Sequence, residues 1–329
     1  MYITLFYHIT QLRQFISMEF IRNLQQLRPQ HRGCVATIGN FDGVHRGHQA
    51  IIAQLKDHAR ALNVPATVII FEPQPQEFFS PDKAPARLTR LREKLNALKN
   101  CGVERVLCLH FNPSLANLSA QDFIQQILVT GLGIKHLVVG DDFHFGKARQ
   151  GNFQQLQAAG AQHGFNVESQ HTVIDTGERI SSTRIRQALA KGELSQAAHL
   201  LGRKYTLYGR VCYGYQRGRT IDFPTANIAL NRHHLPLQGV FAVRIHQLGN
   251  QVLTGVANIG VRPTIGGTKP LLETHIFDFS DTIYGQFIEV EFVQKLRDEQ
   301  RFDSFDELKQ QIITDAAQAR QLFAAEKCI

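Results

Sequence analysis

The sequence contains no tryptophan, only two methionines, and no pair of cysteines at the C-x-x-C spacing. Its five cysteines are odd in number and scattered along the chain, which argues against a disulfide scaffold or a zinc cluster and fits a reducing compartment. No apolar run approaches the roughly 18 residues that a membrane-spanning helix needs. We therefore expect a cytoplasmic protein that has no membrane partner.

Long runs of like charge are also missing. Lys and Arg number 36 against 28 for Asp and Glu, but the basic residues are scattered and form no stripe interleaved with aromatic residues. The excess is compatible with nucleotides, with nucleic acid and with a plain soluble surface, and the scatter argues against nucleic acid. We expect small-molecule partners, and the pattern leaves the oligomeric state open.

A length of 329 residues favours two domains, and two regions of the sequence differ in their hydrophobic pattern. Apolar runs at 34–38, 66–71, 105–111 and 136–140 alternate with helical periodicity, including a helix from about Ala120. They predict an α/β domain with a parallel, Rossmann-like sheet covered on both sides. After about Leu201, strand patterns at 239–246, 272–279 and 287–293 predict a small antiparallel barrel or sandwich. A C-terminal helix with Ser304 and Glu307 in a capping box follows.

The expected boundaries are residues 18–190 for the α/β domain, 191–203 for a linker helix region, and 204–329 for the barrel domain. Residues 1–17 lack the features of a signal peptide, and Met18 precedes an ordinary domain opening. We expect Met18 to be the biological start and residues 1–17 to be a non-native extension. The intact mass of the native protein tests this.

The stretch "NFDGVHRGHQ" (40–49) follows the first predicted strand of the α/β domain. Gly43 and Gly47 let the backbone approach a ligand, and a helix that starts here would present its free N–H groups to an anion. His45 and His48 can donate hydrogen bonds to phosphate oxygens. On this motif alone, a turn that happens to contain two exposed histidines explains the pattern equally well.

A second stretch, "ISSTRIRQAL" (180–189), begins a predicted helix with consecutive hydroxyl residues and two arginines. Taken alone, it reads as an ordinary Ser/Thr cap. Together, the two stretches resemble the nucleotidyltransferase superfamily, with its H-x-G-H and I-S-S-T signatures. The resemblance implies attack on the α-phosphate of ATP with release of pyrophosphate.

Two further loops, "FEPQPQEFF" (71–79) and "GDDFHFG" (140–146), bring aromatic residues to the same predicted sheet edge. A planar ring system would suit them, although each loop taken without context is better explained as an ordinary strand-to-helix turn.

The barrel region carries a different set of polar residues. In "GRTIDFPTAN" (218–227), Thr225 and Asn227 share one side of an extended segment and offer hard oxygen ligands for Mg²⁺; an Asx-type turn is the alternative. "GVANIGVRPTIGG" (255–267) is predicted to be a glycine-rich loop. In "LETHIFDF" (272–279), Glu273 shares a strand face with His275 and Phe277 and could take a proton from an attacking hydroxyl, unless it is merely solvent-exposed. The alternation of Glu289 and Glu291 predicts a solvated strand face.

From about Glu19 to the C-terminal helix, these motifs in this order resemble the bacterial bifunctional riboflavin kinase/FMN adenylyltransferases, the FAD synthetases of prokaryotes. "KAPARLTRLREK", "GVFAV" and "RDEQRFDSFDELKQQI" add to the resemblance. It implies an Mg²⁺-dependent barrel that phosphorylates riboflavin to FMN with ATP. It also implies an α/β domain that adenylylates FMN to FAD. The alternative is an adenylyltransferase whose barrel is a non-catalytic flavin- or RNA-binding module.

The resemblance also implies roles for individual residues. In the α/β domain, His45 and His48 are catalytic; Gly39, Asn40, Phe41, Asp42, Gly47, Ser182, Thr183 and Arg186 bind ATP; and Phe71, Pro73, Asp142 and Phe143 bind the flavin. In the barrel, Glu273 is the catalytic base; Gly218, Arg219 and Thr225 bind ATP; Thr225 and Asn227 bind Mg²⁺; and Asn258, Arg297 and Glu299 bind the flavin. The sequence departs from the family at Asp222, where a glycine is expected, and at His144, where many relatives have arginine.

Overall fold

The computed structural model describes residues 18–170, 172–213, 223–232, 234–249, 251–264 and 267–326. The predicted extension 1–17 lies outside the described residues, as do Gly218, Arg219 and Asp222. The chain forms two compact units. The first contains the chain up to Ala84 and Leu91–Arg179, and the second contains Pro85–Arg90 and the chain from Ile180 onward.

The first unit is built on a six-stranded sheet in which all paired strands are parallel. Its order is β1 (Glu19–Ile21), β4 (Arg105–His110), β3 (Ala66–Glu72), β2 (Val35–Ile38), β5 (His136–Gly140) and β6 (Asn166–Gln170). The four central strands fall where the apolar runs predicted them. The two edge strands were not predicted, because β1 has three residues and β6 ("NVESQ") is half-buried and mostly polar.

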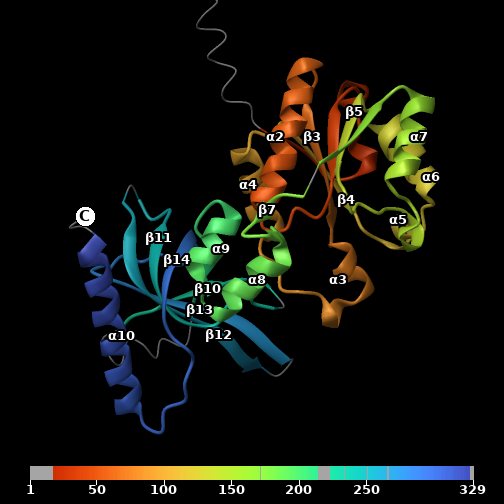
Figure 1. The fold of residues 1–329 in the computed structure, drawn as a ribbon. Coiled ribbons are helices and arrows are strands. Elements are labelled where there is room, and N and C mark those ends of the chain that lie inside the picture. The colour runs from red at the N-terminus through yellow and green to blue at the C-terminus, as the bar shows by residue number, and fades with distance from the viewer. Residues whose placement is uncertain are drawn as a thin grey trace, which may run out of the picture. The chain divides into compact units, whose positions relative to one another are not determined.

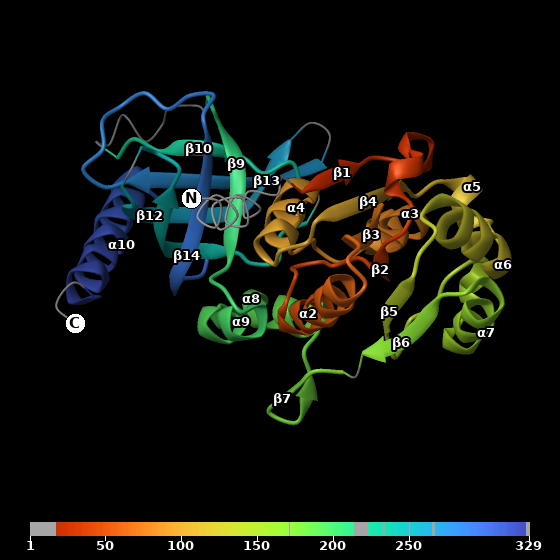
Figure 2. The same ribbon diagram turned by 90° about the horizontal axis from the view of Figure 1, so that it is seen from above.

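Helices cover both faces of this sheet, which confirms the predicted architecture (Figures 1 and 2). Helices α2 (Arg46–Ala61) and α4 (Leu91–Asn100) pack on the face that presents Val35, Val68 and Ile70. The opposite face packs against α6 (Ala120–Phe123), the π-helix η5 (Ile124–Gly131) and α7 (Phe153–His163). Short helices α3 (Pro75–Phe79) and α5 (Pro113–Ala116) follow β3 and β4. Because both faces are buried, the central strands are apolar at nearly every position.

The strand order places a topological switch point at β2. After β2 the chain builds β3 and β4 on one side, and it then crosses to build β5 and β6 on the other. In open parallel sheets, ligands bind beyond the carboxyl ends of the strands at such a point. Because β3, β2 and β5 are neighbours, the loops that follow these three strands lie side by side at the carboxyl edge of the sheet.

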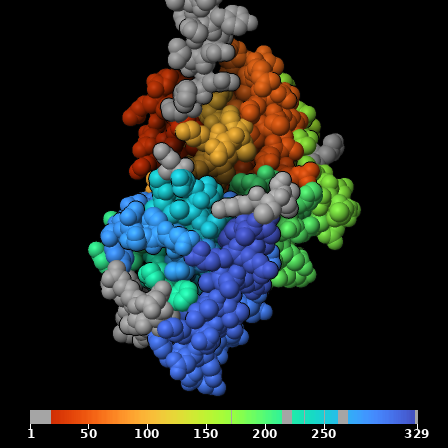
Figure 3. Space-filling view, turned by 90° about the vertical axis from the view of Figure 1, so that its left-hand side faces the viewer, coloured from red at the N-terminus to blue at the C-terminus, as the bar shows by residue number. Residues whose placement is uncertain are grey.

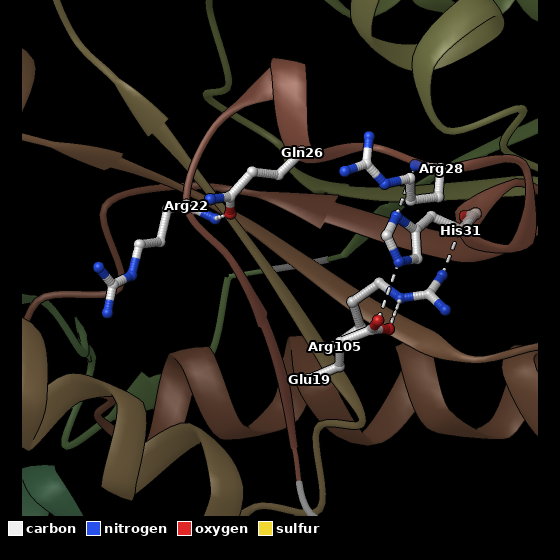
Figure 4. A network of polar contacts seen from close by, with 6 residues as sticks. All are labelled: Glu19, Arg22, Gln26, Arg28, His31 and Arg105. Carbon is white, nitrogen blue, oxygen red and sulfur yellow. Dashed lines mark hydrogen bonds and ion pairs between the residues drawn. The ribbon is translucent and has the colours of Figure 1, made fainter.

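A polar network anchors the edge strand β1 (Figure 4). Glu19 accepts hydrogen bonds from Arg105 Nε on β4 (2.7 Å) and from His31 Nε2 (2.9 Å). His31 Nδ1 in turn accepts the Arg28 N–H at 2.8 Å, so the proton of the neutral ring is on Nε2. Burial raises the pKa of Glu19, but the hydrogen bonds and positive charges of Arg105 and His31 together outweigh it and lower that pKa below its ordinary value of 4.5.

The second unit contains a closed antiparallel barrel, as predicted. Its strand order is β10 (Ala226–Ala229), β13 (Gly267–Ile276), β12 (Leu253–Thr264), β11 (Gly239–His246), β14 (Phe287–Arg297) and β9 (Thr206–Cys212). The prediction of a glycine-rich loop over 255–267 was wrong, because this segment supplies most of strand β12. A Cβ at Gly255 would collide with the carbonyl oxygen of His275 on β13, so this glycine permits close strand pairing.

Within its described residues, three helices complete the second unit. Helix α10 (Phe305–Glu326) packs Ala316, Ala319 and Phe323 against Phe277 of the barrel, and Figure 3 shows it (dark blue) along one side of the unit. The Glu307 N–H donates to Ser304 Oγ at 3.2 Å, and the Asp303 N–H donates to Glu307 at 3.2 Å. Helices α8 (Ser182–Lys191) and α9 (Leu194–Leu201) also belong to this unit, whereas the expected domain boundary lay near residue 190.

Two candidate active sites

The loop after β2 combines a strained backbone with buried anchors. Gly43, Phe41 and Val44 all have positive φ angles (84°, 47° and 42°), which non-glycine residues rarely adopt. Phe41 and Val44 are 1% and 0% exposed and belong to the core beneath α2. This burial offsets the cost of the strained conformation, a combination typical of ligand-binding loops. Because the Phe41 side chain is in the core, any contact of Phe41 with ATP would come from its backbone.

His45 and His48 lie together at the start of α2. Their rings stack with centroids 3.6 Å apart, and His48 also contacts the Phe41 ring at 4.9 Å. His45 caps the helix: its Nδ1 accepts the His48 N–H at 3.4 Å, which leaves the ring proton on Nε2. Gly47 is the second residue of α2, and Gly39, Asn40 and the buried Asp42 lead into this helix start. The predicted pair is therefore assembled beside the positive end of the α2 dipole.

A small hairpin joins two loops at this edge of the sheet. It consists of β7 (Ile174–Asp175) and β8 (Glu178–Arg179). Arg46, the first residue of α2, lies 4.0 Å from Asp175. Arg179 donates hydrogen bonds to both carboxylate oxygens of Asp142, after β5, at 2.8 and 3.1 Å. These bonds lower the pKa of Asp142. Sequence reasoning missed Arg179, because neither the hairpin nor this bidentate pair has a local sequence signal.

Aromatic side chains gather beyond the ends of β3 and β4. Phe71, Phe78 and Phe79 all make edge-on contacts with Phe111, with centroids 5.4–5.8 Å apart. Phe79 is 65% exposed. Sequence reasoning named Phe71 and Pro73 but not Phe111, which joins the group only because β3 and β4 are adjacent. After β5, Phe143 is half-buried and stacks on Phe145, and His144 contacts the Asp142 carbonyl oxygen at 3.0 Å.

The residues of the "ISSTRIR" stretch lie in the second unit. Ser181 Oγ accepts the Arg184 N–H at 3.3 Å as the N-cap of α8, and Ser182 and Thr183 form the first turn. Arg186 Nε donates to the Ala86 carbonyl oxygen at 2.5 Å. The expectation that these residues grip the same triphosphate as His45 and His48 remains a prediction.

In the barrel, strand register aligns most of the predicted kinase residues. Glu273 on β13 is directly opposite Asn227 on β10 and Asn258 on β12. The register continues from Asn258 through Val240 on β11 to Arg297 on β14. Directly opposed residues have Cβ atoms about 4.5–5.5 Å apart. Because Leu272, Thr274 and Ile276 are buried in the barrel, Glu273 lies on its outer face, with His275 and Phe277.

Beside this row, two observations indicate a place for a polar ligand. Asn258 Oδ1 is buried and has no hydrogen-bond partner within the described part of the chain. Gly260 lies two residues after Asn258 on β12. The Glu299 carboxylate occupies the position that a Cβ at Gly260 would take. Residues two apart on a strand share a face, so Glu299 lies on the same side of the barrel as Asn258 and Glu273.

Arg297 is held by an acidic residue that the sequence did not single out. Its Nε and Nη2 donate to Asp315 on α10 at 2.9–3.1 Å, and the Asp315 side chain is only 4% exposed. The Arg297 guanidinium also lies 5.7 Å from the Phe302 ring centroid. This pair connects the end of β14 to α10, so Arg297 has a structural role whether or not it contacts flavin.

His275 holds the segment that carries Thr225. Its Nδ1 lies 2.9 Å from the Pro224 carbonyl oxygen, an acceptor, so the proton is on Nδ1. Its ring also contacts Phe223 at 5.0 Å. Thr225 is exposed just before β10, and Asn227 is half-buried within it. A hydroxyl and an amide oxygen form a hard donor set that suits Mg²⁺, and the amide residue Asn227 is directly opposite Glu273.

The prediction of a solvated strand face was wrong for Glu291. Its side chain is 14% exposed and accepts hydrogen bonds from Arg244 and His246, both at 3.0 Å. Alternation along β14 located the outer face of the barrel correctly, but it could not show that neighbouring strands bring basic partners to it.

These features define a class of protein: an α/β unit with two histidines at a helix start beside its switch point, followed by a barrel with a carboxylate between two amides. The model of the FAD synthetase family matches residues 27–184, and that of the riboflavin kinase family matches residues 201–323. The chain belongs to the bifunctional riboflavin kinase/FMN adenylyltransferase family.

Two curated relatives carry the description of this family, and a solved structure with a different description has a similar fold. The chain is 51% identical to a bifunctional riboflavin kinase/FMN adenylyltransferase of Escherichia coli strain K12, over 94% of this chain and 99% of the relative. A relative from Pseudomonas fluorescens with the same description is 53% identical over 93% and 98% of the two chains. A solved structure described as a macrolide-efflux protein from Streptococcus pneumoniae has a TM-score of 0.76 and 32% identity, covering 91% of this chain and 97% of that one.

The comparisons confirm the predicted family, the enzyme class and the pairing of kinase and adenylyltransferase activities. Among the described residues, no helix combines the length and apolarity needed to cross a membrane.

Proposed function

We propose that the outward row on the barrel is the riboflavin kinase site and that Glu273 is its catalytic base. The Glu273 carboxylate accepts the proton of the flavin's terminal ribityl hydroxyl as that oxygen attacks the γ-phosphorus of ATP; ADP leaves and FMN forms. Asn258 offers a buried acceptor to the flavin, and Glu299 and Arg297 border the same face. Thr225 is also proposed to bind ATP, together with Gly218 and Arg219, which lie outside the described residues.

Thr225 and Asn227 are the proposed Mg²⁺ ligands. Bound there, Mg²⁺ would neutralise charge on the ATP phosphates. Hydroxyl and amide oxygens match its preference for hard ligands, and the position of Asn227 opposite Glu273 would bring the phosphates to the attacking hydroxyl. His275 fixes the backbone just before Thr225 and is thus a positioning residue.

For the second reaction, we propose that the loop after β2 binds the ATP phosphates. An FMN phosphate oxygen attacks the α-phosphorus of ATP and pyrophosphate leaves, so FAD forms without a covalent enzyme intermediate. His45 and His48 stabilise charge on the phosphates, assisted by Gly39, Asn40, Asp42 and Gly47 at the start of α2. Ser182, Thr183 and Arg186 would contribute from α8. Phe71, Pro73, Asp142 and Phe143 would receive the flavin, with Phe111 and Arg179 supporting them.

The observation that carries the kinase proposal is the alignment of Asn227, Glu273 and Asn258 across three neighbouring strands. A flavin- or RNA-binding barrel without catalysis would not need a carboxylate directly between two amides. We also propose that the protein acts in the cytoplasm on small-molecule substrates, with no nucleic-acid partner.

The test is chromatography of flavins after the purified chain is mixed with riboflavin, ATP and Mg²⁺. We expect FMN first and FAD after a lag, with neither product when Mg²⁺ is chelated. FAD formed from added FMN, but no FMN formed from riboflavin, would overturn the kinase proposal and favour a binding barrel. FMN without FAD would overturn the adenylyltransferase proposal.

A further inference from the structure

Three side chains of types that can bind a metal ion meet in the first unit, away from the residues assigned to the two reactions. They are His58 in the last turn of α2, His136 at the start of β5, and Glu168 on β6. His58 Nε2 lies 2.7 Å from Glu168 Oε2, and His136 Nε2 lies 3.4 Å from the same oxygen. The two imidazole rings stack with centroids 3.9 Å apart.

His136 is the fixed member of this cluster. It is 8% exposed, and its buried Nε2 makes no hydrogen bond of good geometry within the described part of the chain, its neighbour being Glu168 Oε2 at 3.4 Å. Its Nε2 faces the Glu168 carboxylate, so the atom that would bind an ion is already directed into the cluster.

We propose that His58, His136 and Glu168 form a site for a borderline divalent cation such as Zn²⁺. Two imidazoles and one carboxylate form a ligand set that Zn²⁺ accepts, with water completing a tetrahedron. The three donor atoms already lie within 4.8 Å of one another. Tetrahedral ligand atoms about 2.0–2.2 Å from zinc are about 3.4 Å apart, so the contact between His136 and Glu168 already has the required length.

Tetrahedral binding would also require His58 and Glu168, the two more exposed side chains, to move apart. The side chains of His58 and Glu168 are 33% and 45% exposed, so they can rotate to separate their 2.7 Å contact and unstack the rings. Their exposure also gives the ion a route from solvent. A cation here lies at the C-terminal, negative end of the α2 dipole, which favours it.

The site would join α2 to β5 and β6, the strands on one side of the switch point. It lies at the far end of α2 from His45, about 20 Å along the helix at 1.5 Å per residue. We therefore assign the ion a stabilising role in the first unit and no part in phosphate chemistry.

The test uses the full chain without an affinity tag, stripped with a chelator and titrated with Zn²⁺ in a calorimeter. We expect one equivalent to bind and to raise the Tm. His136→Gln and Glu168→Gln should each weaken binding by at least about 10- to 100-fold, since even outer-shell partners of a metal contribute that much. His163→Gln, an exposed histidine on α7, is the matched control and should bind as the wild type does.

Co²⁺ gives a second readout, because its visible absorption intensifies in a tetrahedral field. If His136→Gln fails to fold, the more exposed His58→Gln replaces it. Zn²⁺ uptake that is unchanged in both His58→Gln and Glu168→Gln would overturn the proposal, as would a wild-type chain that binds no Zn²⁺. None of these outcomes depends on flavin or ATP, so they are independent of the two proposed activities.

Discussion

In the first unit, His45 and His48 come from one continuous segment at the start of α2, whereas in the barrel Asn227, Asn258 and Glu273 come from three separate strands. The first arrangement depends on local backbone geometry: a strained loop, held by Phe41 and Val44 in the core, delivers both histidines to a helix start. The second depends on register, since a shift of one residue in β13 would turn Glu273 into the barrel interior.

This difference predicts how each site fails. A local loop tolerates changes elsewhere in its sheet as long as its buried anchors remain. A site made by register depends on every strand that contributes to it, and on α10, which holds the end of β14 through Asp315 and Arg297. The predictions below test this contrast from the largest expected effect to the smallest.

Glu273→Gln should lower FMN formation by about 10³-fold, within the range that general bases contribute, because the amide cannot accept the hydroxyl proton. Conversion of added FMN to FAD should remain nearly unchanged, because that reaction is assigned to the other unit. Separate initial rates for the two reactions measure both effects. Glu289→Gln, on the outer face of β14, is the matched control and should keep the kinase rate. A normal kinase rate in Glu273→Gln would exclude the base assignment.

His48→Ala should have the reverse effect, with adenylylation slowed on the order of 10²-fold and FMN formation retained. The reason is the loss of one donor to the phosphates where charge develops. His163→Ala on α7 controls for the loss of a histidine elsewhere in the same unit. If FAD synthesis is unaffected by His48→Ala, the loop after β2 is not the phosphate site.

Asp315→Ala should destabilise the barrel by about 2 kcal/mol, less than for a fully buried ion pair because the Arg297 side chain is 20% exposed. Hydrogen exchange, followed separately in each unit, should show faster exchange in α10 and β14 and unchanged exchange in the first unit. Asp306→Ala, at the exposed start of the same helix, should have little effect. Equal loss of protection in both units would contradict the proposed local role.

Glu19→Gln should cost the first unit about 1 kcal/mol, near the value for surface pairs because Glu19 is 42% exposed. The pKa of Glu19 is lowered in the folded chain, so its stabilisation is present above the ordinary value of 4.5 and is lost as the pH falls through the folded pKa. Protection of β1 against hydrogen exchange should thus differ between wild type and Glu19→Gln near neutral pH. The two should converge in acid, and a difference that grows as the pH falls would contradict the assignment.

Much of the fold could be read from the chain. Apolar runs located β2 to β5, and a capping box located the start of α10. The edge strands β1 and β6 were missed because edge strands carry weaker apolar patterns, and β12 was taken for a loop because its glycines hid a strand that cross-strand pairing stabilises.

The site residues divide in the same way. Motifs within one segment, such as "HRGH" and "PTAN", identified His45, His48, Thr225 and Asn227 as a set with chemistry. Partners from distant segments could not be identified, because a bidentate pair such as Arg179 with Asp142, or Arg297 with Asp315, exists only once the chain has folded.

By itself, the sequence determined the alternation of apolar runs, the helix caps and the residue types of the two motif sets, because these depend on neighbours a few positions apart. Only the tertiary structure decided that Asn227, Glu273 and Asn258 form one row and that Phe111 joins Phe71. It also decided that His58, His136 and Glu168 meet at one point. The physical reason is that strand order and register bring together residues far apart in the chain, and a local pattern carries no information about which strands become neighbours.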